Sequence, residues 1–432
     1  MRLGVLALVV IGCGRIGFDP SGGDDVPGDG PAPPGPVSLT LRADGQPVAN
    51  VDILFHDASG TLLSTTKSNS LGQANANLPG GAMVTVIINQ TDAIEAGFRL
   101  YTIVGVQPND VIEIGDAFDR YALIGDVKVT LPGAFAGATK YQVRHGCTTT
   151  DLINPADVTI ESHYLACSPN NRGAVLAVAL DTDGNRLAYG LVTDIVLSAS
   201  TPANVTVPAW ITTYDTVNVD VRNTPAGASE LFVTLEALWG TAGYDGHRDS
   251  TGDVNPSTIF ALERPTGFSN AQDLVVSAKF GEGWTGVYQR TSGAGTSRMV
   301  DLANALPSLK SATILPDANG RHKLKAVANG DLSATDAGLL DVTYPNVFWS
   351  VLLPPGTVDF QFPALPTAFS MIRSNASTLF DPPGLTFVDA DYITGYAAIR
   401  VKPHTFNGGE DLPANSSVRF TFANFWPFES GN

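Results

Sequence analysis

The chain has 432 residues, of which 44% are hydrophobic and only 16% are charged, and this length suffices for about two to four domains with sizeable cores. Its formal net charge of −17 repels nucleic acid and anionic lipid headgroups, and therefore excludes them as expected partners. The 44 Gly and 29 Pro residues give a turn-rich composition that stays below the Gly and Pro content of disordered chains and suits secreted β-structure.

The N-terminal segment has the composition of an export signal. Arg2 precedes a short apolar run that ends in Val10-Ile11-Gly12-Cys13, and this order is typical of a secretory signal. The run is shorter than the about 20 residues of a membrane-spanning helix. Its last four residues resemble the lipobox of bacterial lipoproteins. The resemblance implies that residues 1–12 are a signal peptide and that Cys13 carries the lipid, palmitate included. An ordinary signal peptide that contains a Cys is the alternative.

Residues 13–36 are predicted to be a disordered tether. From Asp19 to Pro36, 15 of 18 residues are Gly, Asp or Pro, and such a segment buries no core. Its upper reach is about 50 Å. Lipoproteins retained at the inner membrane have Asp after the lipidated Cys, whereas this chain has Gly14. The resemblance thus implies a lipid-anchored location in the cell envelope, at the outer membrane, with the membrane as a partner through the N-terminal lipid.

Folded sequence is expected from residue 37, and residues 37–115 are predicted to form the first module. Val37 to Leu41 alternates between apolar and polar residues as a half-buried strand does. Asp44-Gly45 is a turn signal. Further short strands are expected over 48–55, 61–66, 73–77 and 83–88. Strands of this length and spacing predict an antiparallel β-sandwich.

This first module resembles the carboxypeptidase-regulatory-like domain. The resemblance is carried by the stretch from Asp44-Gly45 to Val51-Asp52-Ile53, a turn at Gly60, the stretch Asn69-Ser70-Leu71-Gly72, and Gly80-Gly81. It implies a transthyretin-like or immunoglobulin-like sandwich. Because that family is not catalytic, it also implies a spacer or binding module. Asn69 stands where an acidic residue is usual.

An internal match predicts two further modules, at 120–214 and 215–330. Val127 to Leu131, with Ala136-Gly137-Ala138, matches Val217 to Val221, with Ala226-Gly227-Ala228, at an offset of 90 residues. This offset is the size of one sandwich module and predicts an internal repeat. Two similar strand-turn-strand segments that meet one backbone requirement are the alternative.

Residues 331–432 are predicted to be a C-terminal β module. Its strand candidates are 347–353, 358–362, 385–388, 396–401 and 417–423, with Pro-rich turns between them. The fold class expected for the chain is therefore all-β. It consists of several tandem antiparallel β-sandwich, immunoglobulin-like modules that follow the signal peptide and the tether.

Three Cys residues are present, and assigning Cys13 to lipid leaves Cys147 and Cys167. An even pair in an exported protein predicts a disulfide. Two buried free thiols are the alternative. Closing a loop of this size contributes about 3 kcal/mol through the unfolded state. No Cys-x-x-Cys spacing occurs, so we expect a structural bridge.

Two acidic segments are candidate metal sites. Asp245, His247, Asp249 and Asp253 form the densest polar cluster, and a loop that carries them would suit a hard cation such as calcium. An exposed loop whose side chains cap their own backbone fits the same residues. The run from Asp181 to Asn185 resembles the start of a calcium loop, but a hairpin turn explains it better. No cofactor is expected otherwise.

No catalytic motif is present: the chain has no Gly-x-Ser-x-Gly, no His-Glu-x-x-His and no phosphate-binding Gly loop. We therefore expect a non-enzymatic envelope protein that binds, adheres or acts as a spacer, with a cell-surface glycan or protein as its partner. Core packing explains most of the large aromatic residues, but some could form a platform on which sugars stack. The candidates for such a platform are Trp210, Trp239, Trp284, Trp349, Trp426 and Tyr244. The alternative function is an anchored hydrolase of glycans or peptides, which needs two carboxylates about 5–10 Å apart in a groove.

Overall fold

The computed structural model describes residues 33–43, 45–90, 97–115, 125–146, 148–155, 157–162, 171–198, 200–239, 242–267, 271–293, 295–316, 321–344, 347–369, 383–403 and 412–424, without the side chains of residues 90, 161–162, 242–245 and 316. Within these ranges the regular elements are strands, apart from a helix, α2 (Tyr396–Val401), and a 3-10 turn, η3 (Thr367–Phe369). The all-β fold class is therefore confirmed. The described residues contain no helix with the length and hydropathy that crossing a bilayer requires.

Several predictions concern residues outside these ranges. The export signal at 1–12, Cys13 and the tether up to residue 32 lie outside the described residues, and so do Cys147 and Cys167. The lipidation and the disulfide therefore stay predictions.

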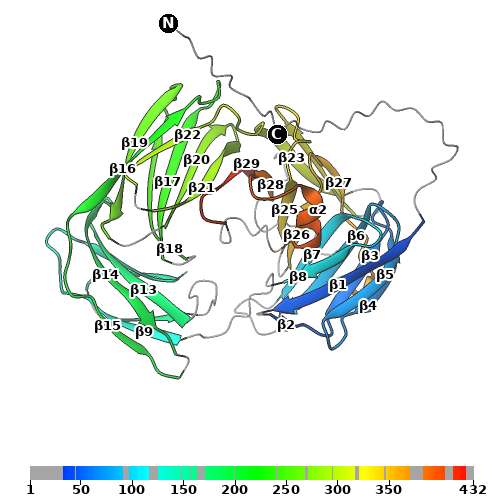
Figure 1. Ribbon diagram of the computed structural model, residues 1–432, viewed down its shortest axis with the longest axis horizontal. Coiled ribbons are helices and arrows are strands. Elements are labelled where there is room, and N and C mark those ends of the chain that lie inside the picture. Colours follow the sequence, from blue (N-terminus) through cyan, green and yellow to red (C-terminus); the bar gives the residue numbers. More distant parts are fainter. Residues whose placement is uncertain are drawn as a thin grey trace, which may run out of the picture.

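The described strands group into four β-sandwich modules, which we name A (35–114), B (125–206), C (214–301) and D (309–424). Figure 1 shows them following one another in an arc that brings module D back beside module A. The strands of module A are β1 (Gly35–Ala43), β2 (Gln46–Pro47), β3 (Asp52–His56), β4 (Leu62–Lys67), β5 (Gln73–Leu78), β6 (Ala82–Gln90), β7 (Gly97–Val106) and β8 (Val111–Ile114). Those of module B are β9 (Gly125–Thr130), β10 (Lys140–His145), β11 (Thr148–Leu152), β12 (Val158–Ser162), β13 (Arg172–Leu180), β14 (Arg186–Val196) and β15 (Ala203–Thr206).

Module C contains β16 (Tyr214–Arg222), β17 (Glu230–Trp239), β18 (Ala242–Thr251), β19 (Ser257–Pro265), β20 (Ala271–Phe280), β21 (Gly283–Ser292) and β22 (Ser297–Asp301). Module D contains β23 (Leu309–Pro316), β24 (His322–Ala328), β25 (Ala337–Tyr344), β26 (Val347–Leu353), β27 (Asp359–Gln361), β28 (Gly384–Ala390) and β29 (Ser416–Asn424). The strands thus put the boundary between the third and fourth modules between 301 and 309, whereas the sequence suggested 330.

Modules A, B and C share one topology. Leaving the short β2 aside, the first, fourth and seventh strands of each form one sheet, and the other four strands form the second sheet. The first strand runs antiparallel to the fourth and parallel to the seventh. Immunoglobulin constant domains divide their strands as ABED and CFG. The modules therefore share the two-sheet architecture of immunoglobulin domains and differ from them in how the strands are divided between the sheets.

Alternation of side chains builds the interior of each sandwich. In β1, Val37, Leu39 and Leu41 are buried between the two sheets, whereas Ser38 and Thr40 face outward. Successive side chains of a strand point to opposite faces, so this pattern buries one face and solvates the other. Modules A, B and C each have an apolar cluster of this origin.

The 90-residue match corresponds to structurally equivalent segments. β9 and β10 of module B occupy the same topological positions as β16 and β17 of module C. The turns between them place Gly137 and Gly227 at φ of 85° and 88°, and glycine adopts this backbone conformation without the steric cost that other residues meet. The match thus reflects both a repeated module and a shared turn requirement.

Module D varies the common plan. β24 to β29 reproduce the first six strands, and the seventh position is taken by β23, which precedes β24 in the chain and runs antiparallel to it. The sequence predicted a strand at 396–401, and this was wrong because α2 forms there. Tyr396, Ile399 and Arg400 share one helical face and pack against modules A and D.

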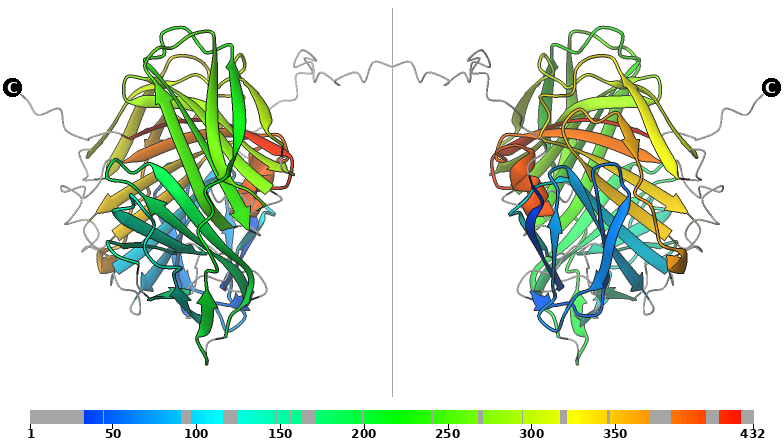
Figure 2. Two further views of the ribbon diagram at one scale, coloured as in Figure 1. Left: turned by 90° about the vertical axis from the view of Figure 1, so that its left-hand side faces the viewer. Right: turned by 90° about the vertical axis from the view of Figure 1, so that its right-hand side faces the viewer.

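Modules C, D and A are joined by strand pairing into one sheet of 12 strands, in the order β18-β17-β20-β21-β29-β28-β25-β26-β7-β6-β3-β4. β21 pairs antiparallel with β29, and β26 pairs parallel with β7. Figure 2 shows the modules from both sides. These pairings satisfy strand edges that would otherwise present open N–H and C=O groups. We call the β21–β29 contact the C–D joint and the β26–β7 contact the A–D joint.

Module B joins module C without strand pairing between the described strands. A small apolar cluster combines Leu176 and Tyr189 of module B with Ala237 of module C. The Arg186 guanidinium also donates to the carbonyl of Gly246 at 2.6 Å.

Candidate binding site

The predicted metal cluster lies on an edge strand, not in the loop that the sequence suggested. Its first three residues belong to β18, which pairs with β17. His247 Nδ1 accepts the backbone N–H of Glu263 at 2.6 Å, Asp249 accepts that of Ser250, and Asp253 is exposed. Among the described residues no three His, Cys, Asp or Glu side chains stand together as a metal site. The side chain of Asp245 is outside the described part, so the four-residue site stays a prediction.

The segment from Asp181 to Asn185 is the predicted hairpin turn, between β13 and β14. Asp181 Oδ1 accepts the backbone N–H groups of Asp183 and Asn185 at 2.9 and 2.8 Å. Hydrogen bonds, first from the Asn185 side chain, lower the pKa of Asp181. The carboxylate therefore caps its own turn.

The Trp residues with described side chains pack against neighbouring rings or apolar clusters. Trp349 is buried and donates from Nε1 to Thr102 Oγ1 at 2.9 Å. Trp210 packs on Tyr141 and donates to a backbone carbonyl, and Trp239 borders the cluster between modules B and C. Trp284 contacts Phe232 edge-on. Trp426 and the side chain of Tyr244 lie outside the described residues.

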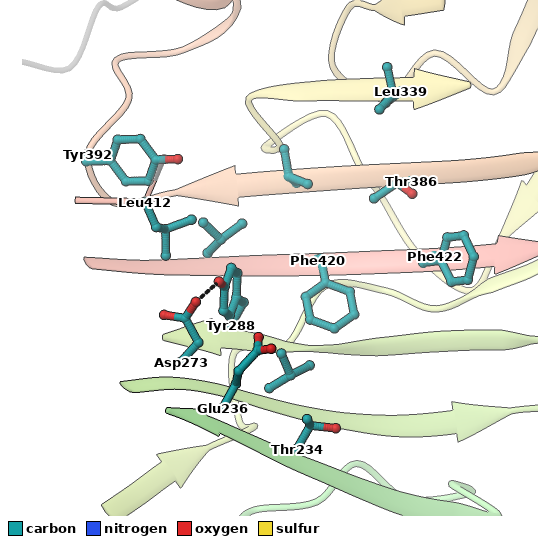
Figure 3. A pocket seen from close by; sticks show the side chains of 13 residues that line it. Thr234, Glu236, Asp273, Tyr288, Leu339, Thr386, Tyr392, Leu412, Phe420 and Phe422 are labelled. Atoms are coloured by element: carbon teal, nitrogen blue, oxygen red, sulfur yellow. Dashed lines mark hydrogen bonds between the residues drawn. The ribbon is translucent and has the colours of Figure 1, made fainter. Parts of the chain in front are cut away.

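A pocket that none of these predictions named opens at the C–D joint. Its volume is about 470 Å³, and both modules line it. The aliphatic part of its wall consists of Val275, Leu339, Val388, Leu412 and Val418, and the aromatic part of Tyr288, Tyr392, Phe420 and Phe422. The polar lining comes from Thr234, Thr386, Glu236 and Asp273. Figure 3 shows these side chains converging from β17, β20, β21, β25, β28 and β29 and from the segments beside them.

Strand alternation explains why these side chains face the pocket. In β20, Leu274 and Val276 are buried in the core of module C, so Asp273 and Val275 point to the opposite face of the sheet. The register of the joint then sets Tyr288 of β21 opposite Val418 of β29. The pocket exists because two modules pair along one edge.

A buried polar network forms one end of the pocket. Asp273 and Arg290 are 4% and 6% exposed, and Arg290 Nε and Nη2 donate to the two Asp273 oxygens, each at 2.8 Å. The Tyr288 hydroxyl also donates to Asp273 Oδ2, and Arg290 Nη1 donates to the Leu412 carbonyl at 3.0 Å. The network thus ties β20 and β21 of module C to the segment before β29.

The ionisation of this network is set by burial and by Asp273. Burial first, and then the negative charge of Asp273, raise the pKa of Tyr288, so the phenol stays protonated. Burial by itself lowers the pKa of Arg290, but the hydrogen bonds and charge of Asp273 outweigh it and raise that pKa. Arg290 therefore stays protonated in its ion pair with Asp273.

Glu236 brings a second carboxylate to the same pocket. It lies directly opposite Asp273 in the β17–β20 ladder, and opposed residues have Cβ atoms about 4.5–5.5 Å apart. Glu236 and Asp273 stand within mostly apolar strands, and this is the sequence signal that points to them, whereas Arg290 stands among polar residues of β21. Nothing local in the sequence indicates that β29, more than a hundred residues away, completes the site.

Comparisons with known proteins identify no family for this chain. No family model matches it, and no curated protein matches it. Among solved structures, the Bacillus anthracis TIE protein is similar with 7% sequence identity and a TM-score of 0.16, over 62% of this chain and 50% of that one. The matched region thus spans half the length of that protein, and a likeness this weak carries no argument.

Proposed function

We propose that this chain is a lipid-anchored cell-envelope protein that binds a ligand at the C–D joint and is not an enzyme. The observation that carries this proposal is the pocket, which has the volume of a small-molecule site and a mostly apolar wall with a few convergent polar groups. The lipobox-like segment ending in Cys13 and the Gly/Asp/Pro tether support the anchoring. The joined modules then act as a rigid spacer that presents the pocket.

We also propose that module A is a carboxypeptidase-regulatory-like domain with a spacer role. In its Asn69-Ser70-Leu71-Gly72 turn, Asn69 Oδ1 accepts the N–H groups of Leu71 and Gln73, each at 2.9 Å. The Asn69 amide oxygen thus fills an acceptor role that a carboxylate also fills, which supports the family likeness despite the departure at this position.

A hydrolase is the second candidate, because Glu236 and Asp273 are neighbouring carboxylates in a pocket. A glycosidase needs one carboxyl group that donates a proton and one that attacks or activates water. Both oxygens of Asp273 accept bonds from Arg290, and one also accepts the Tyr288 hydroxyl. An acid or nucleophile needs a free oxygen at the substrate, so this arrangement favours binding.

The binding function is tested with the purified full-length protein in detergent. A mixed library of amines, alcohols, carboxylates, sugars and short peptides is screened by thermal shift and calorimetry against wild type and Phe420→Ala. We expect at least one compound that binds wild type and is lost in the variant. If no compound shows this dependence on Phe420, the binding proposal is wrong. Turnover of glycans or peptides that Glu236→Gln abolishes would instead establish the hydrolase.

The anchoring is tested by cell fractionation. Wild type should be found in the membrane fraction with an acyl mass on the peptide that contains Cys13, and Cys13→Ser should be released or left unprocessed. Equal partitioning of the two, with no acyl mass, would remove the lipoprotein part of the proposal and leave the binding part intact.

A further inference from the structure

We infer that the pocket at the C–D joint binds an organic cation, that is, a small ligand with an apolar body and one ammonium group. This inference rests on the proposed binding function and adds the chemical class of the ligand.

The shape of the site sets the size and the apolar character of the ligand. A volume of about 470 Å³ lies within the range of pockets that enclose small molecules. Aliphatic side chains from both modules and the rings of Phe420 and Phe422 make up most of the wall. A ligand gains from burial here only if most of its surface is apolar.

The charges in the wall set the sign of the ligand. The charged side chains that line the pocket are Glu236 and Asp273, and the described lining contains no Lys, Arg or His. Arg290 approaches Asp273 from outside the lining and compensates its charge. An anionic ligand would therefore lie beside carboxylates with no cationic side chain in the described lining, whereas a cation would meet favourable partners.

The aromatic rings add a second attraction for a cation. Tyr288 and Phe420 project from the neighbouring strands β21 and β29 toward the side of the pocket that carries Asp273 and Glu236, and Tyr392 lies further from the two carboxylates, beside Leu412 (Figure 3). A cation within about 6 Å of a ring centre is attracted by the ring's quadrupole. Aromatic faces combined with carboxylates favour organic ammonium ligands over neutral ones.

A sugar fits the lining less well. Sugar rings stack on aromatic side chains, but their hydroxyl groups each need a hydrogen-bond partner when buried. Besides the carboxylates and the two tyrosines, the described polar side chains in the wall are Thr234 and Thr386. Buried sugar hydroxyls would therefore be left unsatisfied.

The test uses three probes that share one apolar body and differ in charge: tryptamine, tryptophol and indoleacetate. Calorimetry with the full-length protein should show tryptamine binding about tenfold more tightly than tryptophol, with indoleacetate weakest. Glu236→Gln should reduce the preference for tryptamine over tryptophol to about twofold. Phe420→Ala should weaken both ligands about tenfold. Matched controls are Glu282→Gln and Phe348→Ala, which alter exposed residues outside the pocket and should change neither affinity.

Three other results would each contradict the inference that the pocket binds an organic cation. Tryptophol or indoleacetate binding as tightly as tryptamine, or a preference unchanged by Glu236→Gln, contradicts the cationic class. Tighter binding of methyl glucoside than of tryptamine, lost in Phe420→Ala, would make the site a sugar site and leave the binding function standing. Absence of any Phe420-dependent ligand would remove the binding function as well. Thermal unfolding of each variant shows whether the fold is retained.

Discussion

Module D makes two joints in the same long sheet, and the two differ in what covers the faces of the sheet. At the A–D joint both faces are covered. On one face Leu100 of module A shares an apolar cluster with Trp349 and Phe362 of module D, and on the other Ile399 of α2 and Leu352 extend the core of module A.

At the C–D joint only one face is filled. There Thr285 donates from Oγ1 to the carbonyls of Leu306 and Phe420 at 2.6 and 3.1 Å. The opposite face carries the pocket. Strand pairing by itself therefore does not decide whether a joint becomes a structural seam or a binding site; the segments that pack on its faces do.

The largest effect on stability is expected from removing a buried side chain at the A–D joint. Trp349→Ala removes a buried ring and its hydrogen bond to Thr102 Oγ1, so it should destabilise the A–D joint by about 4 kcal/mol. Hydrogen exchange of the β7 and β26 amides measures the local free energy of opening. The adjacent Phe348→Ala, at a side chain that is 40% exposed, should cost less than about 0.5 kcal/mol. Equal effects of the two variants would contradict the shared core.

A somewhat smaller loss is expected from the ion pair that fixes α2. Arg400 donates to both oxygens of Asp110 at 2.7 and 3.0 Å, and the two side chains are only 12% and 10% exposed. Arg400→Ala leaves the Asp110 carboxylate buried without its partner and should destabilise the joint by about 3 kcal/mol.

The control for Arg400 is an exposed ion pair. Arg172→Ala breaks the pair with Asp194, whose side chains are 53% and 66% exposed, and should cost less than about 1 kcal/mol. Chemical denaturation measures the free energy of unfolding of both variants. Comparable losses would show that the buried Arg400–Asp110 pair contributes no more to the A–D joint than an exposed pair does.

At the C–D joint, we expect a single added methyl group to lower stability. A Cβ at Gly286 would lie 2.1 Å from the carbonyl oxygen of Val276 and 2.9 Å from the Phe420 ring, so Gly286→Ala should cost about 2 kcal/mol by overpacking. It should also weaken ligand binding in the pocket. Gly246→Ala, which meets nothing within 4 Å, is the matched control. Unchanged stability and binding in Gly286→Ala would show that β21 is not closely packed against β20 and the Phe420 ring.

The smallest effect concerns the pH dependence of stability at the A–D joint. His56 of module A is fully buried, and its Nε2 lies 3.0 Å from the Ala364 carbonyl of module D. Burial is the main cause that lowers the pKa of His56. The unfolded chain therefore takes up a proton more readily than the folded one. Stability from neutral His56 is fully present above the unfolded pKa of about 6.5 and decreases as the pH falls below it.

Hydrogen exchange at β7 and β26 between pH 7.5 and pH 5.5, corrected for intrinsic rates, checks this direction. Wild type should lose protection toward the lower pH, and His56→Gln should lose less. His145, buried in module B with its pKa also lowered, chiefly by burial, provides the control, because His145→Gln should leave the pH dependence of the joint unchanged. A wild-type joint with the same protection at both pH values would contradict the role of His56.

The carboxylate pair illustrates what local patterns contain and what they omit. Alternation in β17 and β20 identifies Glu236 and Asp273 as outward-facing residues once the strands are known. Their pairing needs the register between the two strands, and the closed pocket needs β29. Arg290 lies between Gln289 and Thr291 in β21, so no apolar pattern in the sequence marks it as a buried charge.

Sequence by itself determined the local part of this protein. Period-two alternation in strands such as β1, and the left-handed glycines Gly137 and Gly227 in matching turns, follow from backbone sterics and side-chain burial within a few residues. Only the tertiary structure decided which edges pair, where β23 takes the place of a seventh strand, and that residues 396–401 form a helix. These depend on packing between segments distant in the chain, where register is set by the surfaces that meet and not by local periodicity.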